Sequence, residues 1–145
     1  MKKTKVICIG EALIDRIKNQ SNEKFTNFLG GAPANVACAL RKLEISSIFI
    51  GRIGNDKLGS KIINQFQKLS VDTSQVQIDK HLPTRIVKVG RDASGDRYFS
   101  GFEGQSSLGF SDEALDKKLI EKNIKSFHKL FNETKYIVTG TVLLS

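Results

Sequence analysis

The sequence predicts an α/β protein built on a partial, doubly wound parallel sheet that is flanked by helices. Three observations support this class. Buried-strand patterns alternate with amphipathic helical patterns in the first half of the chain, and no repeat or flexible linker divides its 145 residues. Two short β-rich runs near residue 90 add a small accessory sheet. A chain of this length fits one domain and can bury roughly 70% of the surface that its unfolded form exposes.

The first predicted elements make up a parallel strand-helix-strand unit. Residues 5–10 have the alternation of a buried strand and end in glycine. Residues 36–43 carry apolar side chains at helical spacing, and residues 46–51 have the composition of a second buried strand. Parallel strands need a crossover connection, which the intervening helix supplies.

A second amphipathic helix is expected from Leu58 to about Ser70. Its apolar side chains recur at intervals of four, four and three residues, which places them on one helical face. Asp56 stands just before this pattern. It is better explained as the residue that caps the helix than as a ligand-binding residue.

The pattern changes after Pro83. Residues 85–90 and 97–102 are rich in β-branched or aromatic side chains, and the six residues between them include aspartate, serine and glycine. This composition predicts a β-hairpin rather than a parallel crossover. Asp96 is therefore expected to be a turn residue, because a strand and not a helix follows it.

The last part of the chain predicts one more helix and one more strand. Ser111 is expected to cap the helix, with Asp112 and Glu113 in its first turn. Residues 136–143 then have the character of a buried strand. The apolar stripe of the helix comprises Leu115, Leu119, Ile120, Ile124, Phe127 and Leu130.

Composition narrows the possible functions. The net charge of +8 comes from 23 basic and 15 acidic residues, but the basic residues are scattered and, after residue 111, mixed with acidic ones at helical spacing. We therefore expect no nucleic-acid partner. The longest nearly apolar run, residues 136–144, is too short to cross a membrane, and a cytoplasmic location is expected. Two cysteines, Cys8 and Cys38, are too few for a disulfide framework or a zinc site, so buried thiols are expected and no metal site is predicted.

The segment Gly30-Gly31-Ala32-Pro33-Ala34-Asn35 is the strongest candidate for a binding loop. Glycine lets backbone amides approach a ligand closely, and the Asn35 side chain is both donor and acceptor. The alternative is a helix entry that needs glycine only for its geometry. Asp15 follows the first strand, at the edge where open α/β sheets bind ligands, but an ordinary solvated turn residue fits equally well.

Four blocks of this chain, in this order, resemble the amino-terminal half of the ribokinase or PfkB-type carbohydrate kinases. They are residues 10–15, 30–35, 51–59 and 83–102. The Gly-Gly-Ala-Pro-Ala-Asn form of the second block is similar to fructokinase-like members. The resemblance implies a ribokinase-like, Rossmann-like fold in which residues 1–145 form the amino-terminal part of a sugar kinase domain. It also implies a small β lid made of residues about 15–28 and 84–102.

The same resemblance implies the site. Its substrate-binding residues would be Asp15, Gly30, Gly31 and Asn35, with Thr84 and Arg97 of the lid as further candidates. From the residues alone, Arg97 fits a solvated hairpin face as well as a ligand contact. The family transfers the γ-phosphoryl group of a magnesium-bound nucleotide, usually ATP, to a sugar hydroxyl. Its catalytic aspartate and its nucleotide and magnesium groups belong to the carboxyl-terminal half, so no catalytic or metal-binding residue is implied in this chain.

We therefore expect the sugar-binding half of a carbohydrate kinase that is inactive alone, because phosphoryl transfer depends on positioning and charge stabilisation by groups of the other half. The expected partners are a small-molecule sugar and either a complementary carboxyl-terminal polypeptide or a second copy paired through the lid. A non-catalytic sugar-binding or regulatory module is the alternative. A small nucleic-acid binder would rest on the basic charge balance only.

Overall fold

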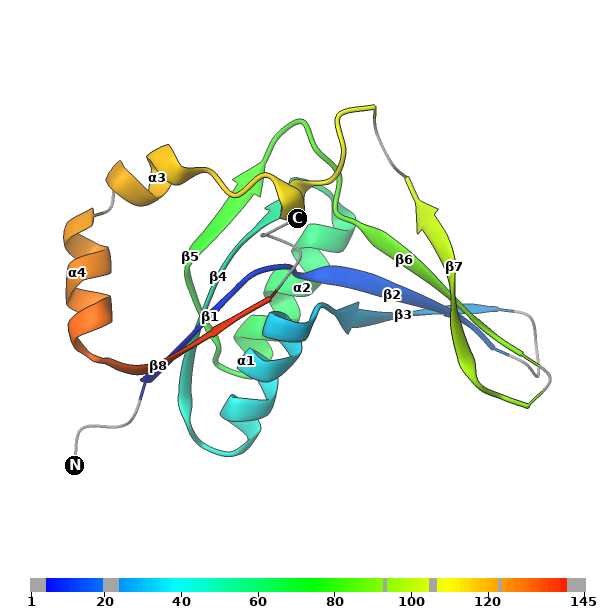
Figure 1. The fold of residues 1–145 in the computed structure, drawn as a ribbon, viewed down its shortest axis with the longest axis horizontal. Coiled ribbons are helices and arrows are strands. Elements are labelled where there is room, and N and C mark those ends of the chain that lie inside the picture. The colour runs from blue at the N-terminus through cyan, green and yellow to red at the C-terminus, as the bar shows by residue number, and fades with distance from the viewer. Residues whose placement is uncertain (1–4, 20–23, 93, 105–106, 123, 141–145) are drawn as a thin grey trace.

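The computed structural model describes residues 5–19, 24–92, 94–104, 107–122 and 124–140, and within them the strands form two four-stranded sheets (Figure 1). Sheet A is entirely parallel and runs in the order β5 (Asp72–Asp79), β4 (Ser46–Gly54), β1 (Lys5–Ile9) and β8 (Thr134–Thr139). Sheet B runs in the order β3 (Phe25–Gly30), β2 (Leu13–Lys18), β6 (Ile86–Arg91) and β7 (Arg97–Glu103). Sheet B extends away from the main body, to the right in Figure 1.

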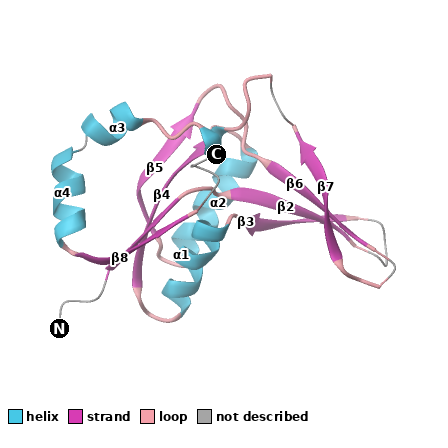
Figure 2. Ribbon diagram, viewed as in Figure 1, coloured by secondary structure: helices cyan, strands magenta, loops and turns pink. Residues whose placement is uncertain are grey.

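Helices pack on both faces of sheet A (Figure 2). Helices α1 (Ala32–Lys42) and α2 (Lys57–Lys68) share a core with Cys8 and Phe49, and the rings of Phe49 and Phe66 lie 4.9 Å apart. On the other face, Ile7 and neighbouring isoleucines pack against Leu130 of α4 (Ile124–Asn132). A parallel sheet that is buried on both faces explains the nearly continuous apolar runs of β1 and β4.

The predicted strand-helix-strand unit and the second helix are confirmed. Strand β4 continues to Gly54, three residues beyond the predicted end. Asp56 is confirmed as the cap of α2, since its side chain accepts from the backbone N–H groups of Leu58 and Gly59. The expectation of buried thiols is also confirmed, and burial raises the pKa of Cys8 to about 11. At neutral pH that thiol is protonated and therefore a poor nucleophile.

Sequence reasoning missed β5 altogether. Among the described strands, it lies at one edge of sheet A and pairs only with β4. Its sequence is Asp-Thr-Ser-Gln-Val-Gln-Ile-Asp, in which only Val76 and Ile78 are apolar. It therefore lacks most of the apolar alternation that identifies a strand. An edge strand is only partly covered by neighbours, and such a position tolerates that composition.

The predicted hairpin is confirmed, because β6 and β7 pair in the antiparallel direction. A second antiparallel pair, β2 with β3, joins it through parallel pairing of β2 with β6. The two chain segments expected to form a lid therefore share sheet B. Asp15 does not lie in a turn after the first strand. It lies inside β2, opposite Phe28 of β3.

The single helix predicted after Ser111 is wrong. Residues Ser111–Glu113 form one 3₁₀ turn, and the chain becomes α-helical only at α3 (Lys117–Lys122) and α4. Arg85 binds the carboxylates of Asp112 and Glu113, which diverts them from a helical first turn. Within the described part of the chain, the Ser111 side chain makes no capping hydrogen bond, and its hydroxyl is buried without a partner.

The last strand is shorter and more exposed than expected. Strand β8 lies at the edge of sheet A, and the part of the prediction covering residues 141–143 falls outside the described residues. Tyr136 is 63% exposed and Ile137 is 53% exposed, so the expectation of a buried strand is wrong here. Among the described helices, none combines the length and apolar character that a membrane span requires.

Candidate functional site

The candidate site lies where the two sheets meet. Strand β1 ends at Ile9, and the chain turns through Glu11 into β2, while β3 ends at Gly30 directly before helix α1. Asp15 and Gly30 come into contact at this junction. A Cβ atom added to Gly30 would lie 2.7 Å from both Cγ and Oδ2 of Asp15. Only glycine therefore leaves the aspartate side chain its present position.

Gly31 is required for a different reason. Its φ of +96° lies in the region that side chains disfavour, and a Cβ atom there would lie 2.4 Å from the carbonyl oxygen of Glu11. The close approach brings the start of α1 against the turn that leads into β2. Asn35 lies in the first turn of α1, where its backbone N–H donates to the Gly31 carbonyl at 2.9 Å and its side chain is exposed.

Asp15 is half-buried and its side chain makes no hydrogen bond among the described residues, so both carboxylate oxygens have acceptor capacity to spare. Burial raises the pKa of this carboxyl above its ordinary value, and the nearby charge of Arg97 opposes that shift. Arg97 comes from β7, at the far side of sheet B. The fold thus brings together groups from β2, β3 and β7.

Thr84 stands apart from this group. It is 2% exposed, its hydroxyl donates to Oδ1 of Asp56 at 2.9 Å, and the same hydroxyl accepts from the Gly54 N–H at 3.1 Å. The Thr84 side chain therefore faces the start of helix α2 and not Asp15. Its contacts tie the beginning of β6 to the end of β4.

Glu11 is the site residue that sequence reasoning missed. It is 5% exposed, and its Oε1 accepts from the Ala32 N–H at 3.1 Å, at the amino end of α1. Its Oε2 is buried and has no hydrogen-bond partner among the residues that the structure describes. A buried carboxylate at a helix amino terminus is stabilised by the helix dipole. The available signal was an acidic residue within the apolar stretch that follows β1.

Replacing Gly30 by alanine is expected to reduce stability by about 1–3 kcal/mol, because the added methyl group overlaps both Asp15 and Leu13. Urea unfolding of Gly30→Ala against the unchanged protein measures this loss. The double variant Gly30→Ala, Asp15→Ala removes part of the overlap and should lose less than the sum of its single changes. Strict additivity would contradict the Asp15–Gly30 contact.

Comparison with known proteins identifies relatives of this chain. A family model described as pfkB family carbohydrate kinase matches residues 3–141. "Probable fructokinase-5" of Arabidopsis thaliana is 36% identical over 130 residues, which cover 85% of this chain and 40% of that protein. Fructokinase-2 of Zea mays is 34% identical over 130 residues, which cover 85% of this chain and 38% of that protein.

Solved structures agree. The crystal structure of fructokinase with bound ATP from Xylella fastidiosa has a TM-score of 0.78 and 26% identity, covering 97% of this chain and 40% of its own. An uncharacterized sugar kinase from Pyrococcus horikoshii has a TM-score of 0.75 and 28% identity, covering 97% of this chain and 44% of its own. The predicted ribokinase-like α/β fold is thereby confirmed.

This chain spans about two fifths of the length of these four proteins. The family match nevertheless extends over nearly all of its residues and includes Asp15, Gly30, Gly31 and Asn35. The chain belongs to the pfkB family of carbohydrate kinases.

Proposed function

We propose that this chain supplies the sugar-binding half of an ATP-dependent carbohydrate kinase and is inactive alone. The observation that carries the proposal is the contact between Asp15 and Gly30 beside the amino end of α1. This contact places a carboxylate with two spare acceptor oxygens next to a glycine pair. Such an arrangement suits a ligand that presents several hydroxyl groups.

Each proposed contact has its own chemistry. Asp15 accepts hydrogen bonds from two sugar hydroxyls, and the Asn35 amide offers one donor and one acceptor to a third. Gly30 leaves room for the Asp15 side chain, and Gly31 lets the start of α1 approach the Glu11 carbonyl. Arg97 lies close enough to Asp15 to oppose its pKa shift, and a guanidinium there donates to ring or hydroxyl oxygens. Thr84 acts indirectly by fixing the start of β6 to Asp56.

The described residues do not fit a magnesium-nucleotide site. Among them, no group of three or more histidine, cysteine and carboxylate side chains could hold a metal ion. The sequence also lacks a phosphate-binding loop of the glycine-lysine-serine or glycine-lysine-threonine type. We propose that ATP and Mg²⁺ are held by the part of the kinase that corresponds to the unmatched length of the relatives, and we derive no catalytic step for this chain.

Two surfaces support a protein partner. Strand β8 is the edge of a parallel sheet and exposes Tyr136 and Ile137, which suits a complementary carboxyl-terminal polypeptide. Sheet B exposes Phe28 and Phe99, which suits pairing with a second copy through the lid. Sedimentation of the purified chain, alone and with a carboxyl-terminal polypeptide from a pfkB relative, distinguishes the two.

A coupled assay with ATP and a panel of hexoses tests the inactivity of the 145-residue chain. No turnover is expected without a second polypeptide. Activity should appear when the complementary polypeptide of a relative is added and a full set of phosphoryl-transfer groups is assembled. Turnover by the isolated chain would refute this part of the proposal.

Asp15→Ala is expected to weaken sugar binding about tenfold to a hundredfold, since it removes two hydrogen bonds to a charged acceptor. Calorimetric titration of the chain with fructose measures the change. Asp72→Ala is the control, because Asp72 is also a strand aspartate but lies on β5 of sheet A. Equal affinity of Asp15→Ala and the unchanged chain would refute the site.

The same titration has an expected pH dependence. Because the pKa of Asp15 is raised in the folded chain, the carboxylate is protonated at a higher pH than an ordinary aspartate. Affinity should therefore be full at neutral pH and fall as the pH drops toward that raised pKa. Asp15→Asn should remove this dependence.

A non-catalytic sugar-binding or regulatory module is the second candidate. It is favoured because the described residues include the proposed sugar-binding groups but no group of three or more histidine, cysteine and carboxylate side chains that could hold a metal ion. In that case sugar affinity should be the same with and without the complementary polypeptide. A half of an enzyme should instead bind sugar more tightly when the second polypeptide completes the site.

A further inference from the structure

Two arginines on one face of sheet B lie directly opposite each other. Arg91 ends β6 and Arg97 begins β7, and they are partners in the antiparallel ladder, both exposed. Opposite residues of an antiparallel pair project to the same face, where like charges destabilise the sheet. The arrangement therefore costs stability unless an anion lies between the two guanidinium groups.

Other arginines of the described chain have protein partners. Arg16 pairs with Glu103 on the opposite face of the same sheet, Arg52 pairs with Asp79 at 2.7 Å, and Arg85 pairs with Asp112 at 2.9 Å. The side chains of Arg91 and Arg97 form no hydrogen bond or ion pair among the described residues, although the charge of Arg97 acts on the nearby Asp15 carboxyl.

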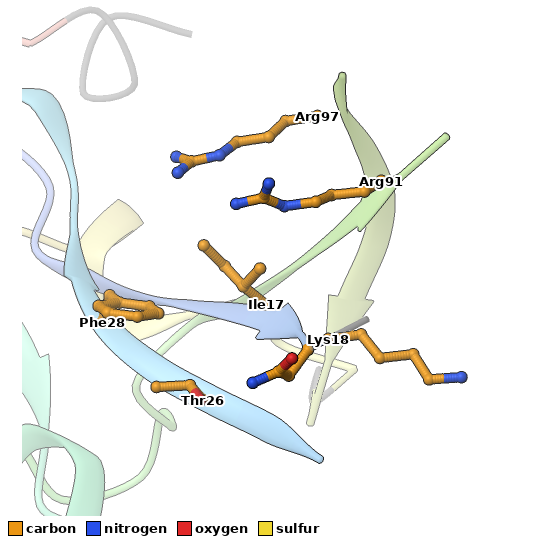
Figure 3. A pocket seen from close by; sticks show the side chains of 7 residues that line it. Ile17, Lys18, Thr26, Phe28, Arg91 and Arg97 are labelled. Atoms are coloured by element: carbon orange, nitrogen blue, oxygen red, sulfur yellow. The ribbon is translucent and has the colours of Figure 1, made fainter. Parts of the chain in front are cut away.

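A cavity of about 380 Å³ lies beneath this pair (Figure 3). Its lining consists of Ile17, Lys18, Asn19, Thr26, Phe28, Arg91 and Arg97. Ile17 and Phe28 provide an apolar floor, and the two arginine side chains extend over it from the β6–β7 hairpin in Figure 3. Two guanidinium groups above one cavity can both donate hydrogen bonds to the same anion.

The cavity adjoins the candidate sugar site. Ile17 is two residues beyond Asp15 on β2, so both side chains lie on one face and are separated by roughly 7 Å along the strand. Phe28 is the ladder partner of Asp15. A ligand of sugar size whose hydroxyls reach Asp15 can therefore place its other end under Arg91 and Arg97.

We propose that Arg91 and Arg97 form a subsite for an anionic substituent, a phosphate or a carboxylate, on the sugar that this chain binds. The proposal rests on the proposed sugar site and deepens it, since it names a phosphosugar or a sugar acid as the substrate class. Guanidinium groups donate paired hydrogen bonds to either oxyanion, and the bound anion relieves the repulsion between the two arginines.

The test is a set of calorimetric titrations of the whole 145-residue chain. The probes are fructose, fructose 6-phosphate, gluconate and inorganic phosphate. A charged sugar should bind about tenfold to a hundredfold more tightly than fructose. A preference for fructose 6-phosphate assigns the subsite to phosphate, and a preference for gluconate assigns it to carboxylate.

Three variants connect the preference to the arginine pair. Arg91→Gln and Arg97→Gln should each reduce the advantage of the charged sugar, and the double variant should abolish it. Lys88→Gln is the matched control. Lys88 lies on β6 three residues before Arg91, so its side chain is on the opposite face of sheet B. It removes one positive charge and should leave the advantage intact.

The possible failures are distinguishable. Equal binding of fructose and both charged sugars, unchanged in the arginine variants, would overturn the anionic subsite and leave the sugar site standing. Binding of inorganic phosphate that depends on Arg91 and Arg97, without affinity for any sugar, would support the subsite and overturn the sugar site. Absence of binding by every probe would overturn both.

Discussion

Replacing Arg85 by methionine is expected to lower the free energy of unfolding by about 3–5 kcal/mol, because it leaves a buried carboxylate without its counter-charge. The Asp112 side chain is completely buried. Nε of Arg85 lies 2.9 Å from one of its oxygens and donates to the other at 3.1 Å. The guanidinium also lies over the rings of Phe102 and Phe110, at 5.1 and 4.9 Å from their centroids. Arg85 thus joins β6 of sheet B to the segment that returns the chain to sheet A.

Urea unfolding of Arg85→Met measures this loss. Arg16→Met is the matched control, since the Arg16 and Glu103 side chains are 22% and 43% exposed and such a pair contributes only about 0–1 kcal/mol. The double variant Arg85→Met, Asp112→Leu removes both charges and should recover much of the stability. If Arg85→Met lowers the free energy of unfolding no more than Arg16→Met does, the buried Arg85–Asp112 ion pair does not have this stabilising role.

The Arg85→Met loss should also depend on pH. Burial raises the pKa of Asp112 already in the unchanged protein, and the charge of Arg85 opposes that shift. Without Arg85, the pKa of Asp112 in the folded protein should rise further above its value in the unfolded chain. Stability of the variant should therefore fall as the pH rises above the unfolded value of about 3.9, and it should fall more than in the unchanged protein.

The second large effect is expected for Asp56→Ala, which should lower the free energy of unfolding by about 2–4 kcal/mol. Oδ1 of Asp56 accepts from the N–H groups of Leu58 and Gly59 at 2.9 and 2.8 Å and from the Thr84 hydroxyl at 2.9 Å. Oδ2 accepts from the Thr84 N–H at 2.8 Å. Alanine leaves the cap of α2 empty and the buried groups of Thr84 unpaired. Thermal or urea unfolding measures the cost.

Asp72→Ala is a suitable control for Asp56→Ala, because Asp72 accepts one backbone N–H, from Ser74, in an exposed position. Asp72→Ala should lower the free energy of unfolding by no more than about 1 kcal/mol. Burial tends to raise the pKa of Asp56, but the hydrogen bonds from Thr84, Gly59 and Leu58 together lower it below its ordinary value. The stabilisation from Asp56 is thus present above the unfolded pKa of about 3.9 and is lost as the pH falls through the lowered folded pKa. Asp56→Asn should weaken that acid dependence.

The elements that sequence reasoning predicted correctly are those with local causes. The apolar spacing of α2 and the capping carboxylate of Asp56 lie within a few residues of each other, so periodicity and capping preference identify them together. The same holds for the β6–β7 hairpin, whose strands flank a turn of Asp, Ser and Gly. Resemblance of four short blocks then indicated the family, which the family match over residues 3–141 confirms.

The wrong predictions have non-local causes. Ser111, Asp112 and Glu113 carry good signals for a helix start, but Arg85, 27 residues before Asp112, takes the carboxylates. The backbone N–H of Asp116 is likewise taken by the Gln77 side chain of β5, at 2.7 Å. Strand β8 has a buried composition but lies at the edge of sheet A. A local sequence pattern does not indicate which distant side chains will bind these residues, or which strand will lie at the edge of a sheet.

Local patterns and short motifs predicted the α/β class, most of the helices and strands, and the family. They did not predict that Asp15 packs against Gly30, that the Thr84 hydroxyl donates to Asp56, or that Arg91 lies opposite Arg97. Periodicity indicates only which side of a helix or strand is apolar. Strand pairing and register, which depend on contacts between distant parts of the chain, decide which polar side chains face one another.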